Sequence, residues 1–133
     1  MSKDRPLIAV VDDEATVRVA LQRLIRAAGL NVKTFTSGIE VLQFMQGQRP
    51  DCIVLDLHMP NVNGFEVQRR MAQCGMHVPV IVITGHDTPE SNARALAGGA
   101  SAYLLKPVDD EMLLDAIAAA IEASPGNSRA PPP

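Results

Sequence analysis

The sequence predicts an α/β domain in which a five-stranded parallel sheet is doubly wound, with helices on both faces. Five short runs rich in Val and Ile recur along the chain, and amphipathic stretches with helical periodicity separate them. Runs such as residues 7–11 and 80–83 do not alternate with polar residues, which is typical of strands covered on both faces. Five strand-then-helix units in 133 residues require right-handed crossovers, which place helices on both sides of the sheet.

The predicted strands are residues 7–11, 31–35, 52–55, 80–83 and 102–105. The first helix follows the first strand and ends at Gly29, where a left-handed residue is expected. The second helix begins at a Ser-x-x-Glu capping box, Ser37 with Glu40, and ends before Pro50. The apolar positions predicted to face inward in these two helices are Val17, Leu21, Leu24, Ile25, Ala28, Val41, Leu42 and Met45.

The remaining helices show similar end signals. Asn63 is expected to cap a third helix that carries Val67 and Met71 inward, and a fourth helix spans about residues 89–98. Asp109 is expected to cap the last helix, whose apolar stripe comprises Leu113, Ile117, Ala120 and Ile121. We therefore predict one domain over residues 1–123, followed by a disordered proline-rich tail or linker over residues 124–133.

Composition narrows the class of protein. Apolar residues make up 47% of the chain and charged residues 20%, and no apolar run is long enough to span a bilayer. The first residues do not form a secretory signal, so we expect a cytoplasmic protein that does not bind membranes. A net charge of −3 argues against direct nucleic-acid binding. Cys52 and Cys74 lack metal-site spacing, and Cys52 is expected to be a reduced core thiol.

Acidic and polar residues follow the predicted strands. Asp12, Asp13 and Glu14 follow the first strand and Asp56 follows the third. Ligands of such sheets bind beyond the carboxyl ends of the strands, so these side chains are expected to converge. Crowded carboxylates repel one another, and a hard cation with oxygen ligands relieves that repulsion. The sequence therefore predicts a Mg²⁺ site at this edge.

A carboxylate beside bound Mg²⁺ can attack an incoming phosphorus atom and form an acyl phosphate. Asp56 is the best placed, because it follows the third strand, which is expected to be central in the sheet. Thr84 follows the fourth strand and Lys106 the fifth, and both can contact the charged oxygens of a phosphoryl group. These residues predict a phosphorylation switch rather than an enzyme with a substrate pocket.

The residues from about 7 to 123 resemble the receiver domain of bacterial two-component response regulators. Thr-Gly-His after the fourth strand and Gln-Arg-Arg in the third helix look most like FixJ-type receivers. The resemblance rests on the order and spacing of four motifs. They are Val-Val-Asp12-Asp13-Glu14, Val-Leu-Asp56-Leu-His-Met-Pro-Asn-Val-Asn-Gly64, Val-Ile-Thr84-Gly and Tyr103-Leu-Leu-Lys106-Pro107. It implies the flavodoxin-like strand order 2-1-3-4-5.

The resemblance also implies a role for each matching residue. Asp56 would be the phosphoacceptor and a Mg²⁺ ligand, together with Asp13, with Asp12 mainly through water, and with the backbone carbonyl of His58. Thr84 and Lys106 would bind the phosphoryl oxygens. Thr84 and Tyr103 would then move, and the face formed by the fourth helix, fifth strand and fifth helix would change.

Each of these residues also has an ordinary structural interpretation. The acidic run suits a helix N-terminus, Asp56 before Met-Pro suits a turn, Thr84 suits a strand, and Lys106 suits a solvated loop. Tyr103 is equally consistent with a core aromatic residue. His58 and His86 stand two residues after Asp56 and Thr84, so we hypothesise that they tune the lifetime of the phosphate, in a direction left open. Solvated loop histidines are the alternative.

The motifs argue against two other functions. Haloacid-dehalogenase-type phosphatases also use an aspartate nucleophile, but they need Asp-x-Asp after the first strand, whereas the pair here is adjacent. A receiver that serves purely as a binding module usually lacks an acidic residue or the lysine, and both are present here. The expected partners are a sensor histidine kinase or phosphotransfer protein and a downstream effector or attached output domain. Phosphorylation-dependent homodimerisation is left open.

Overall fold

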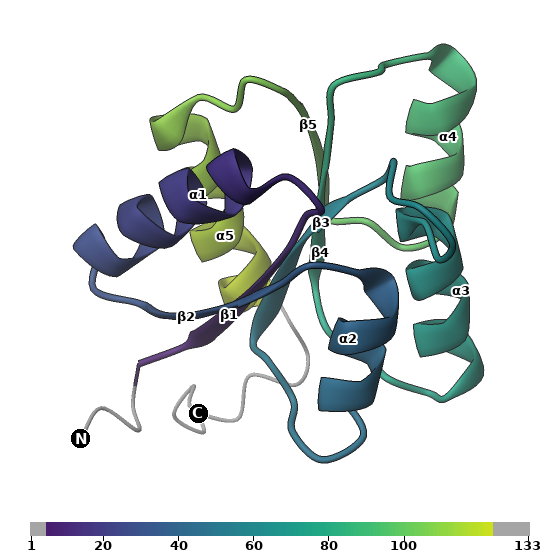
Figure 1. Ribbon diagram of the computed structural model, residues 1–133, viewed down its shortest axis with the longest axis horizontal. Coiled ribbons are helices and arrows are strands. Elements are labelled where there is room, and N and C mark those ends of the chain that lie inside the picture. The colour runs from purple at the N-terminus through teal and green to yellow at the C-terminus, as the bar shows by residue number, and fades with distance from the viewer. Residues whose placement is uncertain (1–4, 124–133) are drawn as a thin grey trace.

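The predicted five-stranded parallel sheet is confirmed by the computed structural model, which describes residues 5–123 (Figure 1). The strand order is β2-β1-β3-β4-β5, as the resemblance implied. The predicted tail, residues 124–133, lies outside the described residues. The strands are β1 Leu7–Val11, β2 Asn31–Phe35, β3 Cys52–Asp56, β4 Val80–Thr84 and β5 Ala102–Leu105. The helices are α1 Ala15–Ala27, α2 Gly38–Phe44, α3 Gly64–Gln73, α4 Pro89–Ala97 and α5 Asp110–Ala123.

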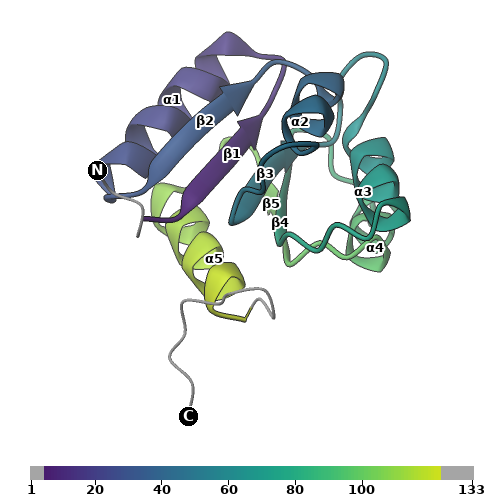
Figure 2. The same cartoon turned by 90° about the horizontal axis from the view of Figure 1, so that it is seen from below.

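Two apolar cores lie on opposite faces of the sheet, because successive strand residues point to opposite sides. On one face, Ala9 and Leu55 pack in a cluster with residues of α2, α3 and α4. On the other face, Val10 and Val54 pack with residues of α1 and α5. Figures 1 and 2 show the same division of the helices into two layers. Both faces are covered, which explains why these strands are apolar without alternation.

The helix ends follow the sequence signals, with two differences at α2: the helix ends at Phe44, six residues before Pro50, and its capping bonds differ from those expected. Ser37 Oγ accepts a hydrogen bond from the Glu40 amide at 3.2 Å, whereas the Glu40 carboxylate accepts from the Thr36 amide at 2.7 Å instead of from Ser37. The capping box is thus shifted by one residue on its second bond. Asn63 caps α3 through the Glu66 amide at 2.9 Å. Gly29 has φ of +88°, as expected for a left-handed residue after a helix.

Strands β3 and β4 are each one residue longer than predicted, so Asp56 and Thr84 are the last strand residues and do not follow the strands. The reason is that sheet pairing uses backbone groups, which a polar side chain at the strand end does not interrupt. In the register, Asp56 lies beside Ile83 and Thr84 beside Leu105. Both side chains therefore lie at the carboxyl edge of the sheet, on neighbouring strands.

Two smaller predictions concern Cys52 and membrane association. Cys52 is buried with a free thiol, as predicted, and burial raises the pKa of that thiol to about 12. Among the helices of the described residues, none has both the length and the apolar character needed to cross a bilayer.

Candidate functional site

An open depression of about 580 Å³ lies at the carboxyl edge of the sheet. Its walls come from the segments that follow β1, β3, β4 and β5, which the parallel topology brings to the same edge. It is lined by Asp13, Glu14, Asp56, His58, Gly85, His86 and Lys106. The structure thus brings together most of the site residues predicted from the sequence.

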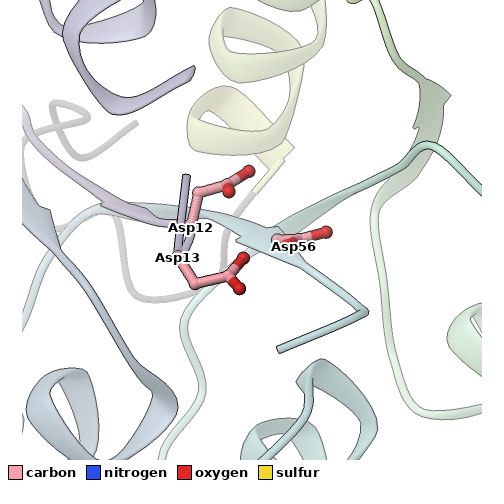
Figure 3. A group of neighbouring side chains, drawn as sticks. All are labelled: Asp12, Asp13 and Asp56. Atoms are coloured by element: carbon pink, nitrogen blue, oxygen red, sulfur yellow. The ribbon is translucent and has the colours of Figure 1, made fainter. Parts of the chain in front are cut away.

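Three carboxylates converge in this region, as Figure 3 shows. Asp12 and Asp56 are buried, with exposures of 0% and 2%, whereas Asp13 is exposed. One carboxylate oxygen from each of the three residues lies within 4.8 Å of the others. Asp12 Oδ1 accepts a hydrogen bond from the Glu14 amide at 2.9 Å. Burying two carboxylates so close together costs free energy unless cations compensate their charge.

Lys106 is the cation that the fold supplies. Its Nζ lies 2.8 Å from Asp12 Oδ2, 3.0 Å from Glu14 Oε1 and 3.5 Å from Asp56 Oδ1. Burial by itself lowers the pKa of Lys106, but the close contacts with Asp12 and Glu14 and the negative charges of Asp56 and Asp12 outweigh it and raise the pKa above its usual value. Lys106 therefore stays charged, and it lies closer to Asp12 and Glu14 than to Asp56.

The negative charge of Asp56 is only partly compensated by the Lys106 ammonium. Burial, followed by the negative charge of Asp12, raises the pKa of Asp56 from 3.8 to about 6. The charge of Lys106 and the hydrogen bond from the His58 amide, at 3.4 Å, act in the opposite direction without cancelling the increase. The Asp56 carboxylate is consequently mostly ionised at neutral pH, and it is a stronger base than an ordinary aspartate.

The donor set suits a hard divalent cation. Asp12 Oδ2 is buried, and Lys106 Nζ lies 2.8 Å from it. Among the described residues, however, no donor forms a hydrogen bond of normal geometry with this oxygen. A buried oxygen of this kind, beside the carboxylates of Asp13 and Asp56, is suited to a cation or to its bound water. The residues present therefore fit Mg²⁺, which prefers oxygen ligands.

Thr84 and Tyr103 lie outside the lining of the depression. Thr84 is buried, and its Oγ1 accepts a hydrogen bond from the His86 amide at 3.0 Å. Tyr103 is partly buried against the α2–α3–α4 core, and its hydroxyl donates to Asp87 Oδ1 at 3.0 Å. Burial, together with the bond to Asp87, raises the pKa of Tyr103. Tyr103 is thus tied to the loop between β4 and α4.

His58 and His86 lie next to each other at the rim of the depression. Both are exposed, and their ring centroids are 5.7 Å apart with an interplanar angle of 85°. Each follows a strand-end residue by two positions and donates its backbone amide to that side chain. The sequence hypothesis placed both residues near the site but did not anticipate their contact.

The structure adds contacts and residues that the sequence reasoning did not give. Glu14 is an ionic partner of Lys106, and Arg18 donates to the Asp12 carbonyl at 2.8 Å. Gly64 has no room for a Cβ, which would lie 2.7 Å from the Asp56 carbonyl oxygen. The Asn63-Gly64 pair at the start of α3 is a sequence signal that could have drawn attention to Gly64. Nothing in the local sequence indicates that Glu14 pairs with Lys106, which is 92 positions away.

Comparisons with known proteins agree with this geometry. The model of the response regulator receiver domain family matches residues 8–118. Nodulation protein W of Bradyrhizobium diazoefficiens is 39% identical over 118 residues, which cover 89% of this chain and 52% of that protein. Response regulator protein TmoT of Ectopseudomonas mendocina is 36% identical over 125 residues, which cover 94% of this chain and 57% of that protein. The chain thus spans about half the length of these relatives.

Solved structures show the same likeness. A response regulator receiver protein from Burkholderia phymatum has 46% identity and a TM-score of 0.79, over 91% of this chain and 99% of that one. The structure of FixJ-N has 33% identity and a TM-score of 0.83, over 89% of this chain and 94% of that one, which agrees with the expected likeness to FixJ-type receivers. From its fold, its acidic site and these matches, the chain belongs to the receiver-domain family of response regulators, the proteins of two-component signalling.

Proposed function

We propose that Asp56 of this chain accepts a phosphoryl group in a Mg²⁺-dependent reaction, and that the resulting change of shape is the signal. The observation that supports this proposal most strongly is the environment of Asp56. It is a buried carboxylate at the end of the central strand, with Lys106 Nζ at 3.5 Å and two further carboxylates nearby.

In the proposed step, a carboxylate oxygen of Asp56 attacks the phosphorus of a phosphohistidine on the donor protein. A P–O bond to Asp56 forms and the P–N bond to the donor imidazole breaks, so the product is an acyl phosphate. The attacking carboxylate must be ionised, and a pKa of about 6 leaves it mostly ionised at neutral pH. The chain catalyses only its own phosphorylation and dephosphorylation in this scheme.

Asp13 and Asp56 would hold Mg²⁺ with the His58 carbonyl, and Asp12 would act mainly through water. The ion supplies positive charge that neutralises the phosphoryl oxygens. The buried Asp12 Oδ2 supports this assignment, because it has an ionic contact with Lys106 Nζ at 2.8 Å but no hydrogen bond of normal geometry within the described residues.

Lys106 would bind a phosphoryl oxygen, which requires its ammonium to move from Asp12 and Glu14 toward Asp56. The buried Thr84 hydroxyl, one strand away from Asp56, would bind another oxygen. Movement of Thr84 would pull on the β4–α4 loop, to which Tyr103 is tied through Asp87. Tyr103 would then turn inward.

The output face in this proposal is formed by α4, β5 and α5. Of the exposed large apolar side chains in the described residues, the three most exposed lie on these elements: Leu96, Leu105 and Met112, at 50%, 50% and 58%. The others are Val19 on α1 and Ile39 on α2. Exposed apolar side chains are typical of interaction surfaces when they gather on one face. The expected partners are a histidine kinase or phosphotransfer protein and an effector, either separate or attached, and a phosphorylation-dependent second copy is a further candidate. The expected compartment is the cytoplasm.

His58 and His86 would border the phosphoryl group and affect how fast water removes it. Their position at the rim of the depression supports this hypothesis. The test is the decay rate of the phosphorylated form in His58→Ala and His86→Ala. Unchanged decay in both variants would remove the hypothesis and leave two solvated histidines.

The first experiment is an intact-mass measurement after incubation with Mg²⁺ and acetyl phosphate. The parent is expected to gain one phosphoryl group, and Asp56→Ala is expected to gain none. Asp115→Ala, which removes an exposed carboxylate on α5, is the matched control and should behave as the parent. A chelator should abolish the gain. An unmodified parent would instead indicate a receiver used only as a binding module.

A further inference from the structure

His58 and His86 are brought together by the pairing of β3 with β4. The two strands are parallel neighbours, and the Leu57 amide donates to the Ile83 carbonyl at 3.2 Å, one residue past Asp56. Beyond this point, the amides of His58 and His86 are fixed by the side chains of Asp56 and Thr84. The same hydrogen bond, from a histidine amide to the side chain two residues before it, thus occurs after two adjacent strands. Both histidines therefore occupy equivalent positions at the carboxyl edge of the sheet.

The separation of the two rings suits joint binding of one metal ion. Zinc–nitrogen bonds are about 2.0–2.1 Å long, so two imidazoles on one tetrahedral zinc have centroids roughly 5 Å apart. The observed centroid distance is 5.7 Å. Both side chains are exposed, so small rotations about their side-chain bonds can close this difference without moving the core.

Oxygen ligands are present in the same depression. The carboxylates of Asp13 and Asp56 line it together with both histidines. Among the described residues, the ligand atoms that lie within 4.8 Å of one another belong to the three aspartates and to neither histidine, so joint binding requires the exposed imidazoles to rotate toward a carboxylate. Two imidazoles, one carboxylate and a water form a common donor set for Zn²⁺, whereas Mg²⁺ prefers oxygen ligands alone. The chemistry of the rim thus differs from that of the all-oxygen group formed by Asp12, Asp13 and Asp56.

We propose that His58 and His86, with a carboxylate of the depression, form a binding site for Zn²⁺ that overlaps the Mg²⁺ site. Nitrogen ligands and the higher affinity of Zn²⁺ for such donors make the rim selective for Zn²⁺ over Mg²⁺. Occupation by Zn²⁺ places a second kind of ion beside Asp56 and excludes Mg²⁺ from the carboxylates. This inference concerns metal binding and does not depend on whether Asp56 is phosphorylated.

The test is calorimetric titration of the chain with Zn²⁺ and, separately, with Mg²⁺, in the absence of any phosphodonor. Cys74 is exposed and stands three residues before His77, so the titrations use a Cys74→Ser background to remove a competing thiolate. His77→Ala is the matched control, because His77 is also exposed but lies before β4, at the opposite end of the sheet.

One Zn²⁺ per chain is expected in the background protein. The ratio of Zn²⁺ affinity to Mg²⁺ affinity should fall about tenfold or more in His58→Ala and in His86→Ala, because each loses a ligand. His77→Ala should keep the ratio. Co²⁺ should give the visible absorption of a tetrahedral site in the background protein and lose it in both rim variants.

Two results would overturn the proposal. If both rim variants keep the affinity ratio of the background protein, Zn²⁺ binds the carboxylates alone. If His77→Ala lowers the ratio as much as the rim variants, the loss is not specific to the His58–His86 pair. Urea unfolding of each variant shows whether it is folded, and folding is expected because these side chains are exposed.

Discussion

The two ends of the sheet are built in opposite ways. The depression at the carboxyl end is lined largely by charged and imidazole side chains. At the amino end, the structure has a hollow of about 370 Å³ between α3, the ends of α4 and α5 and the start of β4, lined mainly by small and apolar residues such as Met71, Met76 and Val78. We call it the amino-end hollow. Its buried polar side chain, Gln68, donates to the Ala95 carbonyl at 3.0 Å.

The difference shows at which end of the sheet buried polar groups lower the stability of the fold. The buried amide at the amino end has a partner, so that end follows the usual rule for buried polar groups. At the carboxyl end, Asp12 Oδ2 lacks a hydrogen bond of normal geometry within the described residues, and the pKa of Asp56 is raised to about 6. Perturbed carboxylates of this kind are typical of functional sites. Four substitutions test the contrast.

Removing the compensating ammonium should have the largest effect. Lys106→Met leaves the buried carboxylates of Asp12 and Asp56 without their cation, and we expect a loss of about 3 kcal/mol in the free energy of unfolding at pH 7 with a chelator. Mg²⁺ should reduce this loss, because the ion supplies the missing positive charge. Urea unfolding with and without Mg²⁺ measures both effects.

Lys33→Met is the matched control for that substitution, since Lys33 is exposed on β2 and its ammonium contacts only the face of the Phe44 ring, at 5.7 Å from the centroid, among the interactions found for the described residues. It should change stability by less than about 1 kcal/mol. A Lys106→Met cost that Mg²⁺ leaves unchanged would contradict the view that Lys106 and the metal compensate the same carboxylates.

Asp56→Asn should stabilise the metal-free domain at neutral pH. The folded state binds the Asp56 proton more tightly than the unfolded chain does, so the parent loses stability as the pH rises from 3.8 to about 6. Asparagine does not titrate, so the variant has no such loss. Above pH 6 we expect its free energy of unfolding to exceed that of the parent by about 2 kcal/mol. This is less than the raised pKa alone would give, because the depression is open to water. The gain should vanish below pH 4.

The measurement is denaturant unfolding of Asp56→Asn and the parent across this pH range, in a chelator. A gain that is the same at pH 3.5 and pH 7 would show that packing, and not the charge of Asp56, is responsible.

The substitution Gly64→Ala tests how closely the residues at the carboxyl end of the sheet are packed. Its Cβ would lie 2.7 Å from the Asp56 carbonyl oxygen and 2.9 Å from the Leu57 Cα, so backbone must move. We expect Gly64→Ala to cost about 1–2 kcal/mol and to slow phosphorylation from acetyl phosphate, because the shift displaces Asp56. Thermal unfolding and the intact-mass time course check the two parts, and normal phosphorylation would show that the shift spares Asp56.

The same change at the amino end should have the smallest effect. A Cβ at Gly98 would meet the Gln68 side-chain amide at 3.0–3.1 Å, and that amide can move aside. Gly98→Ala should therefore cost less than about 1 kcal/mol, chiefly through a weaker bond from Gln68 to Ala95, and leave phosphorylation unchanged. A cost equal to that of Gly64→Ala would mean that both ends are packed alike.

Much of the fold was predictable from local patterns. The caps at Ser37, Asn63 and Asp109 and the glycine at position 29 mark helix ends by bonds between residues close in sequence. The apolar runs predict strand ends one residue before Asp56 and Thr84, because a polar side chain commonly follows a buried strand, and the structure extends each strand by that residue. The shifted capping bond of Glu40 is a choice between two adjacent amides, which sequence spacing does not distinguish.

The sequence by itself determined the elements, the parallel sheet and the residue types gathered at its carboxyl edge, because periodicity, caps and strand-end positions are local properties. Only the tertiary structure decided which of these side chains meet. The contacts of Lys106 with Glu14 and of His58 with His86 join residues far apart in the chain. The raised pKa of Asp56 likewise depends on burial and on Asp12, and both arise only when separate strands pack together.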